Sequence, residues 1–95
     1  MSFVFEWHFA KAASNLSKHG IGFEEAATVF ADPLARIFDD PDHSQAEARE
    51  VIVGHSAAER LLVVSFAARR DSIRIINARQ ATKRERRDYE ENVTP

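Results

Sequence analysis

The chain contains no cysteine, and this absence narrows its chemistry at once. A disulfide framework, a cysteine-based zinc site and a thiol nucleophile are all excluded. Glycine and proline are scarce, with three of each, and there is neither a Gly-rich phosphate loop nor a nucleophile elbow. No apolar run approaches the roughly 18 residues that span a bilayer. The first residues carry neither a basic leader nor a cleavable apolar segment, so we expect a cytoplasmic protein without a membrane partner.

Metal-binding patterns are also missing. The four histidines stand at positions 8, 19, 43 and 55, without the HxxxH spacing of a helical zinc site. The acidic run from Asp39 to Asp42 lacks the Gly and the spaced acids of a calcium loop. We therefore expect neither a metal nor a cofactor.

What is present is an ordinary globular composition with an uneven charge. The 95 residues are 44% hydrophobic and 29% charged, which predicts one soluble domain spanning residues 1–95. The formal net charge is −2, but residues 1–50 hold four bases against nine acids, and residues 51–95 hold nine bases against six acids. Such a split indicates two faces with different partners.

The positive charge is concentrated between Arg69 and Tyr89. Residues 69–87 contain eight Lys or Arg and only two acids. A basic strand that leads into a basic helix is typical of an anion-binding surface, and phosphate is the commonest such anion. The alternative interpretation is a solvated surface helix laced with salt bridges.

Hydrophobic periodicity places the elements of the first half. Residues 3–7 alternate as a strand, with Phe3, Phe5 and Trp7 on one face. Residues 8–19 have helical spacing, and Gly20 ends that helix. A second helix covers residues 23–31. The apolar stripe expected to pack the first helix consists of Phe9, Ala12, Ala13 and Leu16.

The second half predicts an antiparallel meander. A short strand at residues 34–38 and a loop at 39–44 precede three strands, at about 49–55, 61–67 and 72–77, joined by two hairpins. Residues 61–64 are apolar on both faces and predict the central strand. Thr82 and Glu85 form a capping box for a last helix that is polar nearly all round, and we expect that helix to be mobile or held by a partner. The fold class is α+β: an N-terminal strand and two helices, a twisted antiparallel β-sheet and a C-terminal helix.

A set of short segments occurs in a fixed order along the chain. They are Phe5-Glu6-Trp7, Asn15-Leu16-Ser17-Lys18-His19-Gly20-Ile21, Phe23-Glu24-Glu25-Ala26, Val29-Phe30-Ala31-Asp32-Pro33, His43-Ser44, Arg49, Arg60-Leu61-Leu62-Val63-Val64, Ile73-Arg74-Ile75-Ile76-Asn77-Ala78-Arg79 and Glu85-Arg86-Arg87-Asp88-Tyr89-Glu90. Together they resemble the BrnT family of bacterial type II toxins over almost the whole chain.

The resemblance carries definite expectations. It implies a RelE-like fold, a ribonuclease activity that inhibits translation, and a BrnA-type antitoxin with a ribbon-helix-helix fold. It further implies a heterotetramer assembled through an antitoxin dimer, which contacts operator DNA only through the antitoxin. Four positions depart from the family pattern: His8 replaces Asp, Gly22 replaces a capping Ser, Glu59 replaces a hairpin Gly, and Asn77 replaces Ser in the suspected active strand.

RNA cleavage without a metal needs cations at the phosphate and groups that move protons. Arginine suits the first role because its fork donates two parallel hydrogen bonds and keeps its charge. Arg74 and Arg79 are the catalytic candidates of this kind, with a buried ion pair as the alternative for Arg74. Strand alternation predicts Ile73, Ile75, Asn77 and Arg79 on one face, and Arg74, Ile76 and Ala78 on the other.

The proton-transfer candidates are Glu85 and His19. Glu85 could instead serve the capping box, and His19 the dipole of a helix C-terminus. Tyr89 is a candidate base-stacking platform, or it simply docks the last helix on the sheet. The residues expected to bind RNA are Lys18, Arg69, Arg70, Lys83, Arg84 and Tyr89. The basic helix, including Arg86 and Arg87, is also where an acidic antitoxin segment would bind.

Two other functions use the same surface. The chain could bind nucleic acid without cleaving it, which predicts salt-dependent binding and no product. It could also be a decayed toxin that serves only for assembly. RNA that stays intact with the purified protein would favour these two over the ribonuclease.

Overall fold

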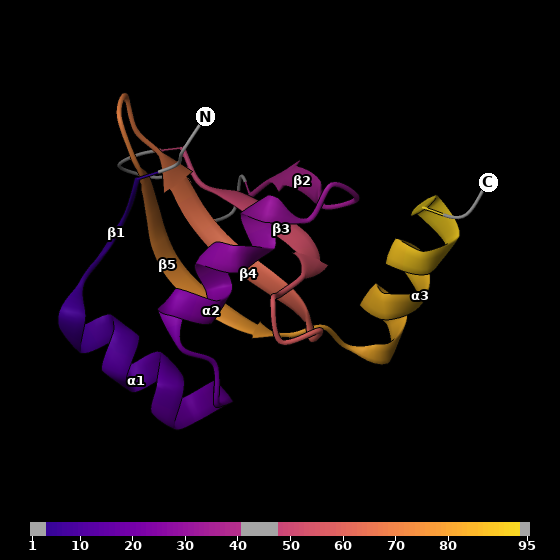
Figure 1. The fold of residues 1–95 in the computed structure, drawn as a ribbon, viewed down its shortest axis with the longest axis horizontal. Coiled ribbons are helices and arrows are strands. Elements are labelled where there is room, and N and C mark those ends of the chain that lie inside the picture. The colour runs from indigo at the N-terminus through magenta and orange to yellow at the C-terminus, as the bar shows by residue number, and fades with distance from the viewer. Residues whose placement is uncertain (1–3, 41–47, 94–95) are drawn as a thin grey trace.

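The computed structural model describes residues 4–40 and 48–93; the predicted loop at 39–44 lies largely outside them, as does Phe3. Within these residues the chain forms one five-stranded sheet of order β1-β5-β4-β3-β2, flanked by helices (Figure 1). The elements are β1 (Phe5–Trp7), α1 (Phe9–His19), α2 (Phe23–Thr28), a 3₁₀ turn η1 (Val29–Ala31), β2 (Arg36–Asp39), β3 (Glu50–His55), β4 (Leu61–Ala68), β5 (Ile73–Gln80) and α3 (Lys83–Val93). No helix in the described ranges is long and apolar enough to cross a membrane.

The predicted meander is confirmed, with one addition. Strands β2 to β5 pair antiparallel in sequence order, and β4 lies at the centre of the sheet. Strand β1 pairs parallel with β5, and the Ile73 N–H donates to the Val4 carbonyl at 2.8 Å. The sheet is therefore mixed rather than wholly antiparallel.

The hydrophobic core fills the space between one face of the sheet and the segment that carries α1 and α2 (Figure 1). The rings of Phe30 and Phe66 meet edge-on at 5.0 Å between centroids, and those of Trp7 and Phe23 at 6.0 Å. Such aromatic contacts stabilise the core beyond the area that they bury. The buried core residues are Ile21, Phe23, Ala26, Val29, Ile52, Leu62, Val64, Phe66, Ile75 and Ala78.

Helix α1 follows the predicted packing stripe only at Ala12, which packs against the core. Phe9 and Leu16 are 85% and 55% exposed, while the one buried residue of the helix is Asn15. The Asn15 amide donates to the carbonyls of Ile21 (3.0 Å) and Ala78 (2.8 Å), and it accepts from the Ala78 N–H (3.0 Å). Strand β1 pairs only with residues 73–75 of β5. Asn15 therefore supplies hydrogen-bond partners to backbone groups of β5 that lie beyond the end of β1. Saturating these buried backbone groups outweighs burying the apolar stripe.

Local turn and cap signals are mostly confirmed. Gly20 adopts φ 69° after α1, and its N–H donates to the Leu16 carbonyl. Gly22 begins α2 without a side-chain cap, as does His8 for α1. Glu59 has φ 63° in the β3–β4 hairpin, a left-handed conformation that glycine adopts without strain. The capping box of α3 is formed: Glu85 N–H donates to Thr82 Oγ1 at 3.1 Å, and Thr82 N–H to Glu85 Oε1 at 2.9 Å.

Candidate functional site

A bulge in β5 decides which side chains face away from the core. Ser65 pairs with Asn77, but the next residue of β4, Phe66, pairs with Ile75, so Ile76 is an extra residue in β5. Residues before and after a bulge change their alternation. Ile75 and Ala78 consequently both face the core.

The predicted alternation along β5 is therefore wrong. Arg74 is paired with Ala67, in the row next to the core pair of Ile75 and Phe66. Arg74 and Asn77 hence share the open face, the face of the sheet turned away from the core, with Arg79. Regular alternation would have separated Arg74 from Arg79. The bulge brings both candidate phosphate ligands to one surface.

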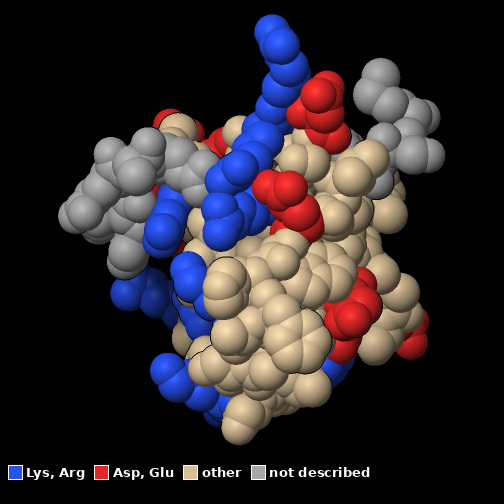
Figure 2. Space-filling view, turned by 90° about the vertical axis from the view of Figure 1, so that its left-hand side faces the viewer, with Lys and Arg blue, Asp and Glu red and all other residues tan. Residues whose placement is uncertain are grey.

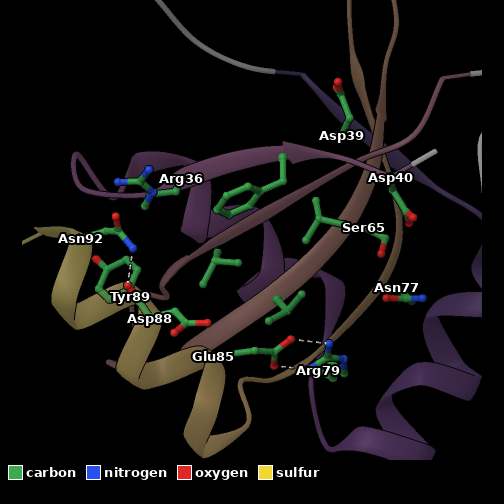
Figure 3. Close-up of a pocket in the computed structure, with 14 residues that line it drawn as sticks. Arg36, Asp39, Asp40, Ser65, Asn77, Arg79, Glu85, Asp88, Tyr89 and Asn92 are labelled. Carbon is green, nitrogen blue, oxygen red and sulfur yellow. Dashed lines mark hydrogen bonds and ion pairs between the residues drawn. The ribbon is translucent and has the colours of Figure 1, made fainter. Parts of the chain in front are cut away.

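The open face forms the floor of a cavity of about 520 Å³ (Figure 3). The strand register arranges its floor as two rows across β2, β3, β4 and β5. One row has an arginine at each end, and the other ends in a polar pair at Ser65 and Asn77. The rows are Arg36, Val53, Val63 and Arg79, and Phe38, Val51, Ser65 and Asn77.

Helix α3 forms one wall of this cavity. It contributes Glu85, Asp88, Tyr89 and Asn92, while Ser65 and Asn77 lie on the side away from the helix (Figure 3). Tyr89 is 5% exposed, although most of the helix surface is polar. The helix contacts the sheet through Tyr89, and the prediction that it is mobile or held by a partner stays a prediction. Its docking depends on a few side chains.

The first of these docking contacts is an ion pair at the base of α3. Arg79 Nη1 and Nη2 donate to the two Glu85 carboxylate oxygens at 2.7 and 2.9 Å. The hydrogen bond from Arg79, opposed by partial burial, lowers the pKa of Glu85 to about 2. The same hydrogen bond raises the pKa of Arg79. Both groups are charged at neutral pH, and this two-pronged geometry holds the guanidinium in one orientation.

The second docking contact joins α3 to the turn after η1. The Tyr89 hydroxyl donates to Asp32 Oδ2 at 3.0 Å, and the His55 N–H donates to the same oxygen at 2.7 Å. Burial and this carboxylate raise the pKa of Tyr89. Burial pushes the pKa of Asp32 upward, but its hydrogen bonds from His55, Leu34 and Tyr89 hold it below the ordinary value. Gly54 makes room for Asp32, because a Cβ at Gly54 would lie 3.0 Å from Oδ2 and 2.8 Å from Ala35 Cβ.

Acidic residues are among the described lining of the cavity, although the segment from Arg69 to Tyr89 is basic. The lining includes Asp39, Asp40, Glu85 and Asp88 against Arg36 and Arg79. Across the described ranges, no three His, Asp or Glu side chains gather as metal ligands.

Of the eight basic side chains in residues 69–87, Arg79 lines the cavity and the other seven do not. Seen from the β1 edge, Lys and Arg side chains gather on one side of the molecule, while an uncharged surface faces the viewer (Figure 2). Arg69 pairs with Glu6 at 3.3 Å, and Arg70 is exposed in the β4–β5 hairpin. Four cations of α3 project into solvent: Lys83, Arg84, Arg86 and Arg87.

A comparison with families of known proteins decides the family. Residues 7–85 match the sequence model of the family described as "Ribonuclease toxin, BrnT, of type II toxin-antitoxin system". The chain belongs to the BrnT family. The predicted membership is thus confirmed over most of the chain, and the family is one of ribonuclease toxins with an antitoxin partner and an RNA substrate.

A solved BrnT structure has the same fold. The crystal structure of the Brucella abortus ribonuclease toxin BrnT matches with a TM-score of 0.67 and 20% sequence identity, covering 86% of this chain and all of that one. This likeness confirms the α+β architecture. No curated protein sequence matches the chain.

The BrnT fold brings together only part of the predicted site. Arg79, Glu85 and Tyr89 line the cavity, and Arg74 lies on the same sheet face outside it. Lys18 and His19 end α1 and are exposed, and neither lines the cavity. The other predicted RNA-binding residues do not line the cavity: Arg69 and Arg70 lie in the β4–β5 hairpin, and Lys83 and Arg84 on the first turn of α3.

Sequence reasoning missed most of the cavity lining. Arg36 and Phe38 come from β2, where an arginine lies over a phenylalanine ring at 6.0 Å. Asp88 and Asn92 lie three and seven residues after Glu85, on the same face of α3. This helical spacing was the one sequence signal that could have identified them as lining residues. Nothing local in the sequence shows that β2 and α3 border one space.

Proposed function

We propose that this chain is a metal-independent endoribonuclease toxin that inhibits translation and is neutralised by a BrnA-type ribbon-helix-helix antitoxin. The observation that carries the proposal is the placement of Arg74, Asn77 and Arg79 on one open face of a chain that belongs to a ribonuclease toxin family. Cleavage then uses the 2′-hydroxyl of the RNA as nucleophile, attacking the adjacent phosphate.

The arginines act on the phosphate. Each guanidinium donates to the non-bridging oxygens and stabilises the charge that grows on them as the 2′-oxygen attacks. Arg79 is held in a fixed orientation by Glu85, which lowers the cost of ordering it at the moment of reaction. Arg74 has no hydrogen bond or ion pair among the described residues and is half-buried, so its head group is available to a phosphate.

Glu85 is better suited to positioning than to proton transfer. An efficient general base has a pKa near the working pH, whereas the pKa of Glu85 is about 2. Its two oxygens also already accept hydrogen bonds from Arg79 and from the Thr82 N–H. We assign Glu85 to holding Arg79, whereas His19 ends α1 and does not line the cavity.

The antitoxin is expected on the outer surface of α3. Lys83, Arg84, Arg86 and Arg87 are exposed there and attract an acidic partner segment. Such a segment would cover the cations that gather RNA at the mouth of the cavity. In this proposal the antitoxin binds the operator DNA, and the heterotetramer assembles through an antitoxin dimer.

The deciding experiment incubates the purified chain with a structured messenger RNA in excess EDTA. We expect cleavage, and we expect Arg74→Ala and Arg79→Ala each to reduce it by about 10² or more, since preplaced donors are typically worth this much. Lys11→Ala, an exposed cation of α1, is the matched control. Products should carry a 2′,3′-cyclic phosphate, and a cell-free translation reaction should stop. Cleavage that needs a divalent cation would refute metal independence.

A non-catalytic nucleic-acid-binding module is the second candidate. The low pKa of Glu85 favours it, because a carboxylate that stays ionised at neutral pH is a poor general base. It predicts RNA affinity that falls steeply with salt and RNA that stays intact at every protein concentration. An assembly protein without RNA binding would show neither effect.

A further inference from the structure

Two uncharged polar side chains lie next to each other on the floor of the cavity. Ser65 of β4 is paired with Asn77 of β5, so both side chains project from the open face as cross-strand neighbours (Figure 3). Within residues 4–40 and 48–93, neither side chain makes a hydrogen bond or an ion pair. The Ser65 hydroxyl and the Asn77 amide are therefore open to a ligand in the cavity.

The other uncharged polar side chains in the described lining are already engaged. The Tyr89 hydroxyl donates to Asp32 at 3.0 Å. The Asn92 amide nitrogen donates to a backbone carbonyl of its own helix at 2.7 Å. Ser65 and Asn77 are thus the uncharged polar side chains of this lining that have no partner among the described residues.

Groups of this type suit a hydroxyl of the ligand. A hydroxyl both donates and accepts hydrogen bonds, and the side chains of serine and asparagine also do both. A guanidinium only donates, and an ionised carboxylate only accepts. In RNA the 2′-hydroxyl of the ribose is a donor and an acceptor, and its presence is what distinguishes RNA from DNA.

The Ser65–Asn77 pair lies between the two arginines proposed to bind the phosphate. The partners of Arg74 and Arg79 on β4 are two residues from Ser65 in either direction, so the rows of these arginines lie about 7 Å to each side of the pair. Glu85 and the Gln80 carbonyl engage three N–H groups of Arg79, which leaves two of its five for a phosphate. In a nucleotide, the carbon that bears the 2′-hydroxyl is bonded to the carbon that bears the 3′-phosphate. A 3′-phosphate held by these arginines therefore brings the 2′-hydroxyl to the pair.

The bulge in β5 is a second observation at this place. Its extra residue, Ile76, directly precedes Asn77, and it is the bulge that puts Asn77 on the same face as Arg74. Bulges are common next to active sites, where they redirect a side chain. The irregular pairing thus aligns one amide with the candidate phosphate ligands.

We propose that Ser65 and Asn77 bind the 2′-hydroxyl of the ribose whose 3′-phosphate is held by Arg74 and Arg79. Asn77 Oδ1 accepts a hydrogen bond from the hydroxyl, and Ser65 Oγ donates one to its oxygen. The pair orients the nucleophile and takes no proton. The inference rests on the proposed ribonuclease function and deepens it, because it names the side chains that select RNA over DNA.

The test compares adenosine 3′-monophosphate with 2′-deoxyadenosine 3′-monophosphate. The two nucleotides differ only in the 2′-hydroxyl, and neither contains a phosphodiester that could be cleaved. Each is titrated into the ¹⁵N-labelled chain, with the backbone amides of β5 and the Asn77 side-chain amide as reporters of binding. The buried side-chain amide of Asn15 reports that the fold is intact. We expect the ribonucleotide to bind about fivefold more tightly, which corresponds to one net hydrogen bond.

Variants of the pair test whether these side chains produce the preference. Asn77→Ala should make the two affinities equal. Ser65→Ala should lower the preference, and Ser65→Thr, which keeps the hydroxyl, should restore it. Gln80→Ala is the matched control, because it removes an exposed amide from the same strand outside the described lining, and it should leave the preference unchanged. A merely structural role would weaken the binding of both nucleotides equally.

The outcomes distinguish this inference from the proposed function. A ribose preference that Asn77→Ala abolishes, in a chain that does not cleave RNA, would support the pair and refute the ribonuclease. RNA cleavage together with equal affinity for the two nucleotides, or with a preference that survives both alanine variants, would refute the pair and leave the ribonuclease standing. Equal losses of affinity for both nucleotides in the alanine variants would also refute it, as would the absence of any shift at millimolar nucleotide.

Discussion

The helices α1 and α3 are attached to neighbouring residues of one strand, and the attachments differ in kind. On the core side of β5, Asn15 of α1 bonds to the backbone of Ala78. On the open side, Glu85 of α3 bonds to the side chain of Arg79. The first contact is buried and uncharged, while the second is charged, with side chains 33% and 40% exposed. Water can replace the second contact but not the first.

This difference predicts two levels of cooperativity. Breaking the α1 contact leaves buried backbone groups without partners, so that helix should unfold only with the whole domain. Breaking the α3 contact exposes groups that water solvates, so that helix should detach alone. The helix that walls the cavity is thus the one that can leave it. The following changes test the comparison.

Asn15→Ala should have the largest effect. It leaves the Ile21 carbonyl and both backbone groups of Ala78 unpaired in a buried site. We expect a loss of about 3 kcal/mol or more in the free energy of unfolding, measured by urea denaturation. Ser14→Ala, at the exposed neighbouring position, is the control. A loss similar to that of the control would show that the amide does not hold α1.

Tyr89→Ala should release α3 without unfolding the domain. Tyr89 is buried among otherwise exposed helix residues, and its loss should reduce docking by about 2 kcal/mol. Hydrogen exchange of residues 83–93 should accelerate by about tenfold or more, while the amides of β4 stay protected. Tyr89→Phe, which keeps the ring and loses the bond to Asp32, should have a smaller effect. Uniform acceleration across β4 and α3 would contradict separate detachment.

Acid should loosen α3 before it affects α1. The pKa of Glu85 is about 2 in the folded protein against an ordinary value of 4.5. The ion pair therefore stabilises α3 fully above pH 4.5, and this contribution disappears as the pH falls towards 2. For a pair that is one-third exposed, we expect about 1 kcal/mol. Hydrogen exchange at pH 6 and pH 3 would measure it, after correction for the intrinsic exchange rate.

Glu85→Gln supplies the control for this pH dependence. It removes the titrating group, so the docking of α3 should become weaker at pH 6 and nearly independent of pH between these values. Asn15 does not titrate, and α1 should keep its protection throughout. An unchanged acid response in Glu85→Gln would assign the effect to another carboxylate, with Asp32 as the next candidate because hydrogen bonds also lower its pKa.

His8→Asp should have the smallest effect and should strengthen α1. His8 begins that helix without a side-chain cap, and Asp accepts a hydrogen bond from the first free N–H groups. We expect a gain of about 0.5–1 kcal/mol in the free energy of unfolding, measured in urea at pH 7. His8→Ala tests whether removing the imidazole alone is enough. An equal gain in both variants would contradict capping.

The parts of the fold that follow local rules were predictable. Gly20 ends α1, Thr82 and Glu85 cap α3, and the apolar run at residues 61–64 is the central strand. Each of these features depends on neighbours in sequence. The membership in the BrnT family was likewise predictable, because it depends on an ordered set of segments.

The features that the sequence did not reveal depend on contacts between residues that are far apart in the chain. The role of Asn15 follows from the length of β1, which stops short of Ala78. The cavity itself exists because β2 and α3 border one space, which brings Arg36 and Phe38 close to residues of α3. Tertiary contacts of this kind leave no local periodicity.

The extra residue at Ile76 has a consequence for comparing relatives. The bulge shifts the phase of β5, so residues on its two sides obey opposite rules for which face they occupy. A relative with the same number of residues but without the bulge would present the counterparts of Arg74 and Arg79 to opposite faces of the sheet, although an ungapped alignment would pair both. Residue identity along this strand should therefore be read separately on each side of position 76.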